Sequence, residues 1–134
     1  MPANTSPIFA LVPELSSATV TLATTDRTGA TMGNTAILLT AGANGAKITQ
    51  FIAKAAGSNP STIILIFVSD STGANFKLFD ELGVAAVNAT ALVTAQRAVN
   101  TYTDLQLKAG QVVRVGTTIA VTDGINVFAA KGDY

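Results

Sequence analysis

The side chains that could do chemistry in this chain are its carboxylates, because the 134 residues include no histidine and no cysteine. The candidates among its carboxylates for a metal ion or for acid–base work are Asp70, Asp80, Glu81, Asp104, Asp123 and Asp133. A calcium loop spaces its ligands two residues apart and ends in glutamate, and a glycosidase needs two carboxyl groups facing one cleft. Only Asp80 and Glu81 are close in sequence, and neighbouring residues of a strand point to opposite faces. We therefore predict solvated surface carboxylates and no metal site.

The sequence supports neither a nucleophilic catalytic pair nor a phosphate-binding loop. Nucleophilic catalysis needs a base beside a serine or threonine, and no spacing here marks out a Ser–Lys or carboxylate pair. The segment GANGAKIT at residues 42–49 resembles a phosphate-binding loop, but Ala46 stands where a glycine should precede Lys47, and Ile48 stands where Ser or Thr should follow. We interpret this segment as a hairpin turn. The sequence thus predicts no enzyme, no catalytic residue and no cofactor.

The composition argues against charged partners and for contacts with other subunits. Only 12% of residues are charged, with 8 basic and 8 acidic side chains, so we expect no nucleic-acid partner and no membrane partner. A hydrophobic content of 49% and a mean hydropathy of +0.44 are high for a protein that stays soluble alone. We expect partner subunits to cover the excess. The alternative is that small Ala, Thr and Ser residues on strand surfaces raise the hydropathy without making an adhesive surface.

Short apolar runs, separated by turns rich in Gly, Asn, Asp and Ser, predict an all-β protein. The expected strands cover residues 16–23, 35–40, 47–56, 61–69, 76–87, 97–107, 111–115 and 124–130. About eight short strands without a long helical period are typical of an antiparallel β-sandwich, and we favour jelly-roll connectivity. The Ala-rich segment 84–97 is ambiguous: it suits a strand end plus loop, or a short helix that begins at Asn88 or Thr90.

The first 15 residues are predicted to form an extended arm, followed by a single β-sandwich domain at residues 16–134. Three of the four prolines lie in residues 1–13, and proline cannot donate to a sheet ladder. The arm also carries an apolar cluster that needs cover, from its own domain or from a partner. The candidate docking residues of the arm are Pro7, Ile8, Phe9, Leu11 and Val12. The N-terminus lacks a positively charged region, and its apolar run at residues 8–12 is too short for a secretion signal.

The segment STIILIFVS at residues 61–69 is the expected centre of a sheet. Six large apolar residues follow one another, so both faces of this strand are apolar. With Ile63, Leu65 and Phe67 directed to the core, a second face would need cover. We expect that face to be a subunit interface in a symmetric oligomer, with a trimer preferred; the alternative is cover by the arm or by the Ala-rich loop. The residues of this candidate oligomer interface are Ile64, Ile66 and Val68.

Three segments of the C-terminal half carry a resemblance: STIILIFVSDSTGANFKLFDEL at residues 61–82, LQLKAGQVVRV at residues 105–115 and the ending GINVFAAKGDY at residues 124–134. In these segments the chain resembles small β-sandwich virion structural proteins of tailed bacteriophages. The resemblance covers roughly the last 75 residues, in soft patterns rather than an invariant signature. Head decoration or cement proteins of this kind are often trimers that sit on the capsid surface. The resemblance therefore implies binding to the major capsid protein.

The resulting expectation is a bacteriophage capsid decoration protein, a homotrimer made in the host cytoplasm and located on the virion surface. It would stabilise the head shell by burying apolar area between copies and against the capsid. A tail or fibre-tip module that binds a host glycan or receptor is the alternative, although the chain has only two tyrosines, Tyr102 and Tyr134, to offer as exposed aromatics. A cellular β-sandwich binding domain is the third possibility.

Overall fold

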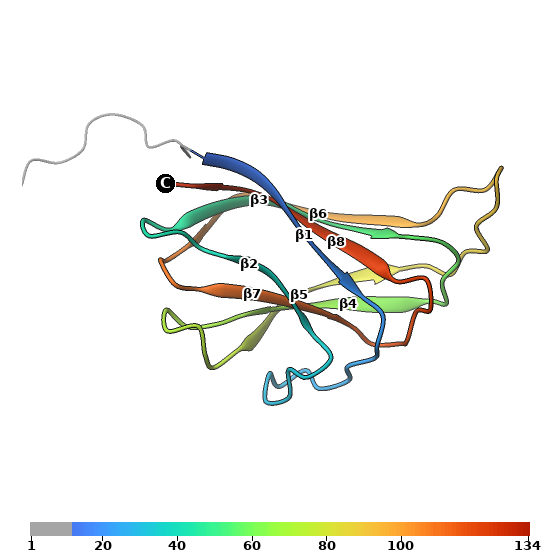
Figure 1. Cartoon of the computed structure of the whole chain (residues 1–134), viewed down its shortest axis with the longest axis horizontal. Helices are drawn as coiled ribbons and strands as arrows, with labels where there is room; N and C mark the ends of the chain where they lie inside the picture. Colours follow the sequence, from blue (N-terminus) through green and yellow to red (C-terminus); the bar gives the residue numbers. More distant parts are fainter. Residues whose placement is uncertain (1–11) are drawn as a thin grey trace, which may run out of the picture.

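The computed structural model describes residues 12–134, and four of the predicted docking residues of the arm, Pro7, Ile8, Phe9 and Leu11, lie outside that range. The described residues form eight strands and no helix, as Figure 1 shows. The strands are β1 (Val12–Val20), β2 (Ala36–Thr40), β3 (Ala46–Ala55), β4 (Thr62–Val68), β5 (Lys77–Val84), β6 (Arg97–Leu107), β7 (Val112–Thr117) and β8 (Ile125–Asp133).

The strands form two four-stranded antiparallel sheets that pack face to face (Figure 1). One sheet has the order β1-β8-β3-β6 and is called the first sheet here; the second sheet has the order β2-β7-β4-β5. Only the connection between β4 and β5 stays within one sheet, and every other connection passes from one sheet to the other. The prediction of an all-β antiparallel sandwich is confirmed.

Strand boundaries differ from the predicted ones at both ends of the domain. β1 begins at Val12, so residues 12–15 are paired with β8 and belong to the first sheet instead of the arm. β8 runs on to Asp133, because the last residues pair with both β1 and β3. The Ala-rich segment is a loop from residue 85 to residue 96 without helical turns, so the helical alternative is wrong.

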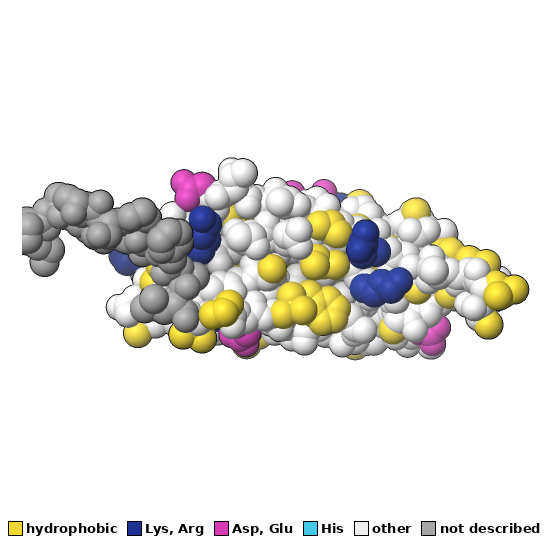
Figure 2. All heavy atoms as spheres, turned by 90° about the horizontal axis from the view of Figure 1, so that it is seen from above, with side chains coloured by type: hydrophobic (Ala, Val, Ile, Leu, Met, Phe, Trp, Pro, Cys, Tyr) yellow, Lys and Arg dark blue, Asp and Glu magenta, His cyan; other side chains and the backbone are white. Residues whose placement is uncertain are grey.

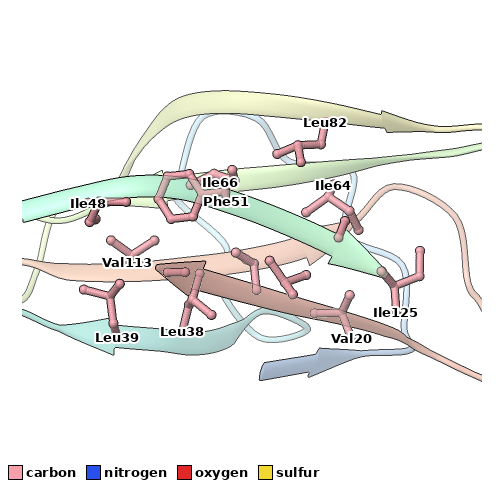
Figure 3. Close-up of a cluster of buried hydrophobic side chains, with 14 of the residues drawn as sticks. Val20, Leu38, Leu39, Ile48, Phe51, Ile64, Ile66, Leu82, Val113 and Ile125 are labelled. Atoms are coloured by element: carbon pink, nitrogen blue, oxygen red, sulfur yellow. The ribbon is translucent and has the colours of Figure 1, made fainter. Parts of the chain in front are cut away.

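The hydrophobic core lies between the two sheets. Figure 3 shows its larger side chains, which include Phe51 of β3, Ile66 of β4, Val113 of β7 and Ile125 of β8, all fully buried. Inward-facing residues alternate with outward-facing ones along β8, where Val127 and Ala129 are also fully buried. Each large aliphatic side chain buried in this way contributes about 1.5–3 kcal/mol to the free energy of folding.

The predicted faces of β4 are exchanged in the structure. Ile64 and Ile66 are fully buried in the core, and Val68 packs against it. The prediction that these three residues form an oligomer interface is therefore wrong, because no part of Ile64 or Ile66 reaches the surface. Leu65 and Phe67, predicted to be internal, lie on the outer face of the second sheet. A period of two cannot choose between two apolar faces of one strand.

Candidate interaction surfaces

The outer face of the second sheet is covered by the chain itself, through the connection between β1 and β2. Leu65 is fully buried on this face, although it does not belong to the core cluster. It lies between Gly116 of β7 and Glu81 of β5 in the ladder. The backbone amide of Thr24 donates to the carbonyl of Thr117 at 2.7 Å, which places the connection beside this end of β7. The Thr24 methyl group lies over Gly116, the ladder neighbour of Leu65. The intramolecular cover thus exists, but a loop that the sequence did not single out provides it.

Further along the same connection, Arg27 contacts β5 and Thr35 contacts β7. The guanidinium Nε of Arg27 contacts Oε1 of Glu81 at 2.5 Å. Arg114, opposite the buried Phe67 in the ladder, lies with its guanidinium carbon 5.6 Å from the centroid of the Phe76 ring. Its Nη1 donates to Oγ1 of Thr35 at 3.2 Å. This face is therefore closed by a set of specific polar and cation–π contacts.

Two turns of related sequence lie side by side beyond this face. The segments DRTGAT at residues 26–31 and DSTGAN at residues 70–75 share an Asp, a Thr two residues later and a glycine at positive φ. In each turn the Asp Oδ1 accepts from the amide and the hydroxyl of that Thr. The turns line a shallow hollow of about 710 Å³. The repeated Asp-x-Thr-Gly-Ala pattern is the sequence signal that could have identified this pair of turns.

These hydrogen bonds act on the acidity of both aspartates. Bonds from the Thr72 hydroxyl, the Asn75 amide and the Ala74 backbone lower the pKa of Asp70 to about 2. Bonds from the side chain and the backbone of Thr28 likewise hold the pKa of Asp26 below its usual value. Both carboxylates are exposed and already occupied by donors of their own turns. They act as turn caps, a role that short polar side chains commonly take in loops.

Asp80 and Glu81 point to opposite faces of β5, as predicted. Glu81 faces Arg27 on the outside, whereas Asp80 faces the side where β5 meets β6. There the Asp80 carboxylate accepts from the Tyr102 hydroxyl and, at 2.9 Å, from Nδ2 of Asn100. Burial and this carboxylate raise the pKa of Tyr102. The Tyr102 ring meets the Phe51 ring edge-on, with centroids 5.6 Å apart, so the network connects the side of the sandwich to its core.

Lys131 is a cation held inside one end of the sandwich. Only 4% of its side chain is exposed, and its Nζ lies 3.2 Å from Oε2 of Glu14 and 3.2 Å from Oδ2 of Asp133. Asp133 also accepts from the amide of Gly42 at 3.3 Å, which ties the β2–β3 turn to β8. A buried charge needs paired carboxylates because desolvation is costly. The cluster is structural, since all three groups are engaged with one another.

The remaining carboxylates do not gather into a site. Asp104 accepts from the side-chain amide of Gln106 at 2.9 Å, and Asp123 lies exposed beside Gly57. Within residues 12–134, no group of three or more Asp or Glu side chains is placed to hold a metal ion. Over the same range, no helix of sufficient length and apolarity to span a membrane occurs.

The loops at one end of the sandwich form a hollow of about 740 Å³ between the β3–β4, β5–β6 and β7–β8 connections. Asn59 is buried there, and its Nδ2 donates to the carbonyls of Pro60 and Ala85, while its Oδ1 has no partner within the described residues. Ser58, Asn88 and Asp123 add polar groups to the wall, and none of the described aromatic side chains lines the hollow. The β5–β6 loop extends beyond the hollow and carries Leu92, which is 95% exposed.

The outer face of the first sheet carries an apolar row that the described chain leaves at the surface. In the ladder, Phe128 of β8 lies beside Ile52 of β3, which in turn lies beside Val99 of β6. None of the three belongs to the core cluster, and Val99 is 41% exposed. Leu15 of β1 adds an exposed side chain nearby. In Figure 2, hydrophobic side chains gather at the middle of this face, next to Lys and Arg side chains.

The outer faces of the two sheets therefore differ in what covers them. The middle of the second sheet, around Leu65, is covered by a loop of its own chain, while Ile37 of the edge strand β2 stays 53% exposed. The first sheet presents apolar side chains beside basic ones at its middle. No family model matches the chain, and searches of curated proteins and of solved structures also gave no match.

Proposed function

We propose that the protein is a non-enzymatic structural component of a bacteriophage virion, a decoration protein that binds the head shell and stabilises it. The observation that carries the proposal is the apolar row of Phe128, Ile52 and Val99 on the outer face of the first sheet. The chain covers the middle of the second sheet, where Leu65 is fully buried, with its own β1–β2 connection. An apolar face left at the surface beside a covered one is typical of a site for another protein.

The connectivity supports this proposal at the level of architecture. We infer that the sandwich is a jelly roll, because its eight strands divide into the orders β1-β8-β3-β6 and β2-β7-β4-β5, with nearly all connections crossing between the sheets. Jelly rolls occur in viral capsid proteins and in lectins, so the architecture is compatible with a virion role and does not by itself select it.

The proposed mechanism is burial of apolar area, summed over many symmetric copies on the shell. Each Å² of apolar surface removed from water is worth about 25 cal/mol, so a modest contact repeated around the capsid contributes substantially. Contacts with the major capsid protein and between copies of a homotrimer would both draw on this source. Val12, the one candidate docking residue of the arm within the described range, is exposed at the start of β1, where it can take part in such contacts.

Co-sedimentation with capsids tests this function directly. Purified protein is mixed with expanded empty capsids of the phage whose genome encodes the chain, and bound protein is quantified after centrifugation through a cushion. The proposal expects saturable binding at a fixed number of copies per capsid and a higher melting temperature of the shell. Absence of binding to the capsids would remove the proposal, and binding to intact host cells instead would favour the tail or fibre-tip alternative.

The loop-end hollow beside Asn59 favours one second candidate, a tail or fibre-tip module that binds a host glycan. Sugar hydroxyl groups would find acceptors and donors in Ser58, Asn88 and Asp123, and one buried acceptor is the unpaired Oδ1 of Asn59. Among residues 12–134 the lining includes no aromatic side chain, which weighs against this candidate because sugar rings commonly stack on aromatic faces. A glycan array with the wild-type protein and the Asp123→Ala variant separates the two functions.

A further inference from the structure

Two basic side chains lie directly opposite each other on the outer face of the first sheet. Lys54 of β3 and Arg97 of β6 are partners in the ladder, one row beyond the apolar row. Like charges opposite each other destabilise a pair of strands. The ion pairs among residues 12–134 involve Arg27 and Lys131, so neither Lys54 nor Arg97 meets a carboxylate of the described chain. Lys54 Nζ donates instead to the backbone carbonyl of Ala95 at 2.7 Å.

The apolar row adjoins this basic pair on two strands. Val99 follows Arg97 by two residues on β6, and Ile52 precedes Lys54 by two residues on β3, so each apolar side chain and its basic neighbour point to the same face. A partner that covers the row would displace water from the basic pair as well. Carboxylates of that partner would then meet Lys54 and Arg97 in a medium of low dielectric constant, where their attraction is stronger than in water.

We propose that this face docks a protein surface that presents aliphatic side chains flanked by Asp or Glu. The inference rests on the proposed function. The surface of the head shell that this face contacts would be a patch of aliphatic and acidic side chains. The apolar row argues for a protein rather than a phosphate polymer, since nucleic-acid backbones offer charge without aliphatic side chains.

A second copy of the chain does not fit this face by a two-fold axis. An isologous interface has to be complementary to itself. Three successive rows of the ladder make up the middle of the face, and they contain basic residues but no acidic ones. The rows are Thr19, Asn126, Lys54 and Arg97; Ser17, Phe128, Ile52 and Val99; and Leu15, Ala130, Gln50 and Thr101. A two-fold axis that pairs these three rows with themselves would bring none of their side chains as a carboxylate to Lys54 and Arg97.

The test compares two double charge reversals in the co-sedimentation assay with empty capsids. The Lys54→Glu/Arg97→Glu variant changes the docking face, and Lys77→Glu/Lys108→Glu makes the same change in net charge at exposed sites outside this face. We expect the first variant to bind capsids about tenfold or more weakly, and the second to bind as the wild type does. A Val99→Asp variant should also bind weakly. Thermal unfolding of each variant verifies that it is folded.

The outcomes separate the inference from the proposed function. If wild-type protein does not bind capsids, the proposed function fails. If wild-type protein binds and the Lys54→Glu/Arg97→Glu variant binds equally well, the docking face is wrong while the function stands. Sedimentation velocity of the free protein provides the third arm. If the free protein is a dimer or trimer and the Lys54→Glu/Arg97→Glu variant dissociates into monomers, the face binds a second copy of the chain. That result would overturn the inference. Tightening of wild-type binding at high salt would also contradict it.

Discussion

Thr24 lies over Gly116, and its methyl carbon Cγ2 occupies the space that a β-carbon on Gly116 would need. The same threonine donates its backbone amide to the carbonyl of Thr117 at 2.7 Å, next to the glycine. Ala23 forms a parallel bridge with Thr117, so a short piece of the β1–β2 connection runs along β7. The glycine in this strand thus allows the backbone of the connection to approach and to cover the second sheet.

Gly116→Ala is expected to destabilise the protein by about 1–3 kcal/mol, the usual cost of forcing an extra carbon into a packed site. Thr24 and Thr35 both line the space, so neither can move away without breaking the contacts of the connection. The free energy of unfolding from urea titration measures the effect.

Gly83→Ala is the matched control, because Gly83 lies in β5 of the same sheet and nothing would lie within 4 Å of its new β-carbon. The double variant Gly116→Ala/Thr24→Ser removes the clashing methyl group and should recover part of the lost stability. Strictly additive effects of Gly116→Ala and Thr24→Ser would show that the two residues are not coupled, against this account.

Leu65→Ala tests whether the outer face of the second sheet is a true second layer of packing. Leu65 is fully buried beneath the connection, so the substitution is expected to cost about 2–5 kcal/mol, as at a core position. Leu15→Ala is the matched control: it removes the same side chain from the outer face of the first sheet, where Leu15 is 60% exposed, and should cost less than about 0.5 kcal/mol. Equal unfolding free energies for the two variants would show that the cover is not formed in solution.

Most strands could be predicted from the sequence because their apolar runs are short and separated by Gly-, Asn- and Asp-rich turns. β6 and β2 are placed within a residue of their predicted bounds. The faces of β4 could not be predicted, since all six residues from Ile63 to Val68 are apolar and either set of alternate residues could face the core. β7 carries the missing information: Arg114 lies between Val113 and Val115, which are both buried, and it pairs with Phe67. That information becomes usable only when the pairing register is known.

The candidate surfaces were harder to predict because they depend on several strands at once. Phe128, Ile52 and Val99 come from three strands far apart in the sequence, and only the order β8-β3-β6 brings them into one row. The cover of Leu65 comes from a polar loop with no apolar signal of its own. Nothing in residues 24–34 indicates which sheet they cross, so the sequence suggested a subunit interface where the chain supplies its own cover.

Asp80→Asn is expected to lower the pKa of Tyr102. Burial raises this pKa first, and the hydrogen bond and negative charge of Asp80 raise it further, so the phenol ionises at a higher pH than an exposed tyrosine. Because the folded-state pKa lies above the unfolded value, this group contributes stability below the unfolded pKa, and the contribution is lost as pH rises through the folded pKa. Absorbance at an ultraviolet wavelength specific for tyrosinate follows the titration in a Tyr134→Phe background, which leaves Tyr102 as the only tyrosine.

The comparison of Asp80→Asn with the parent protein needs only the direction in which the Tyr102 pKa changes. An Asp80→Asn variant keeps a side chain of the same size that can still accept from the Tyr102 hydroxyl, so a fall in the Tyr102 pKa reports the lost charge. Phe79→Ala is a second useful variant, since the Phe79 ring lies 5.7 Å from the Tyr102 ring and helps to exclude water. A Tyr102 titration unchanged by Asp80→Asn would mean that the hydroxyl does not face this carboxylate.

Asn75→Ala is expected to raise the pKa of Asp70 toward its usual value of 3.8, because the Asn75 amide donates to Oδ2 of Asp70 at 2.7 Å. In the wild type, the pKa of Asp70 is about 2, so the ionised form holds the turn together at all but strongly acidic pH. The stability that it contributes is present above the unfolded pKa near 3.8 and is lost as pH falls through about 2.

The carbon chemical shift of the Asp70 carboxyl group gives the midpoint of the Asp70 titration. The Thr72 amide proton should titrate with it, since that amide donates to Oδ1 of Asp70 at 2.9 Å. Ser71→Ala is the control, because the Ser71 side chain donates to neither oxygen of Asp70. An Asp70 midpoint near 3.8 in the wild type would contradict the bonded turn and, with it, the role of the repeated Asp-x-Thr-Gly-Ala pattern.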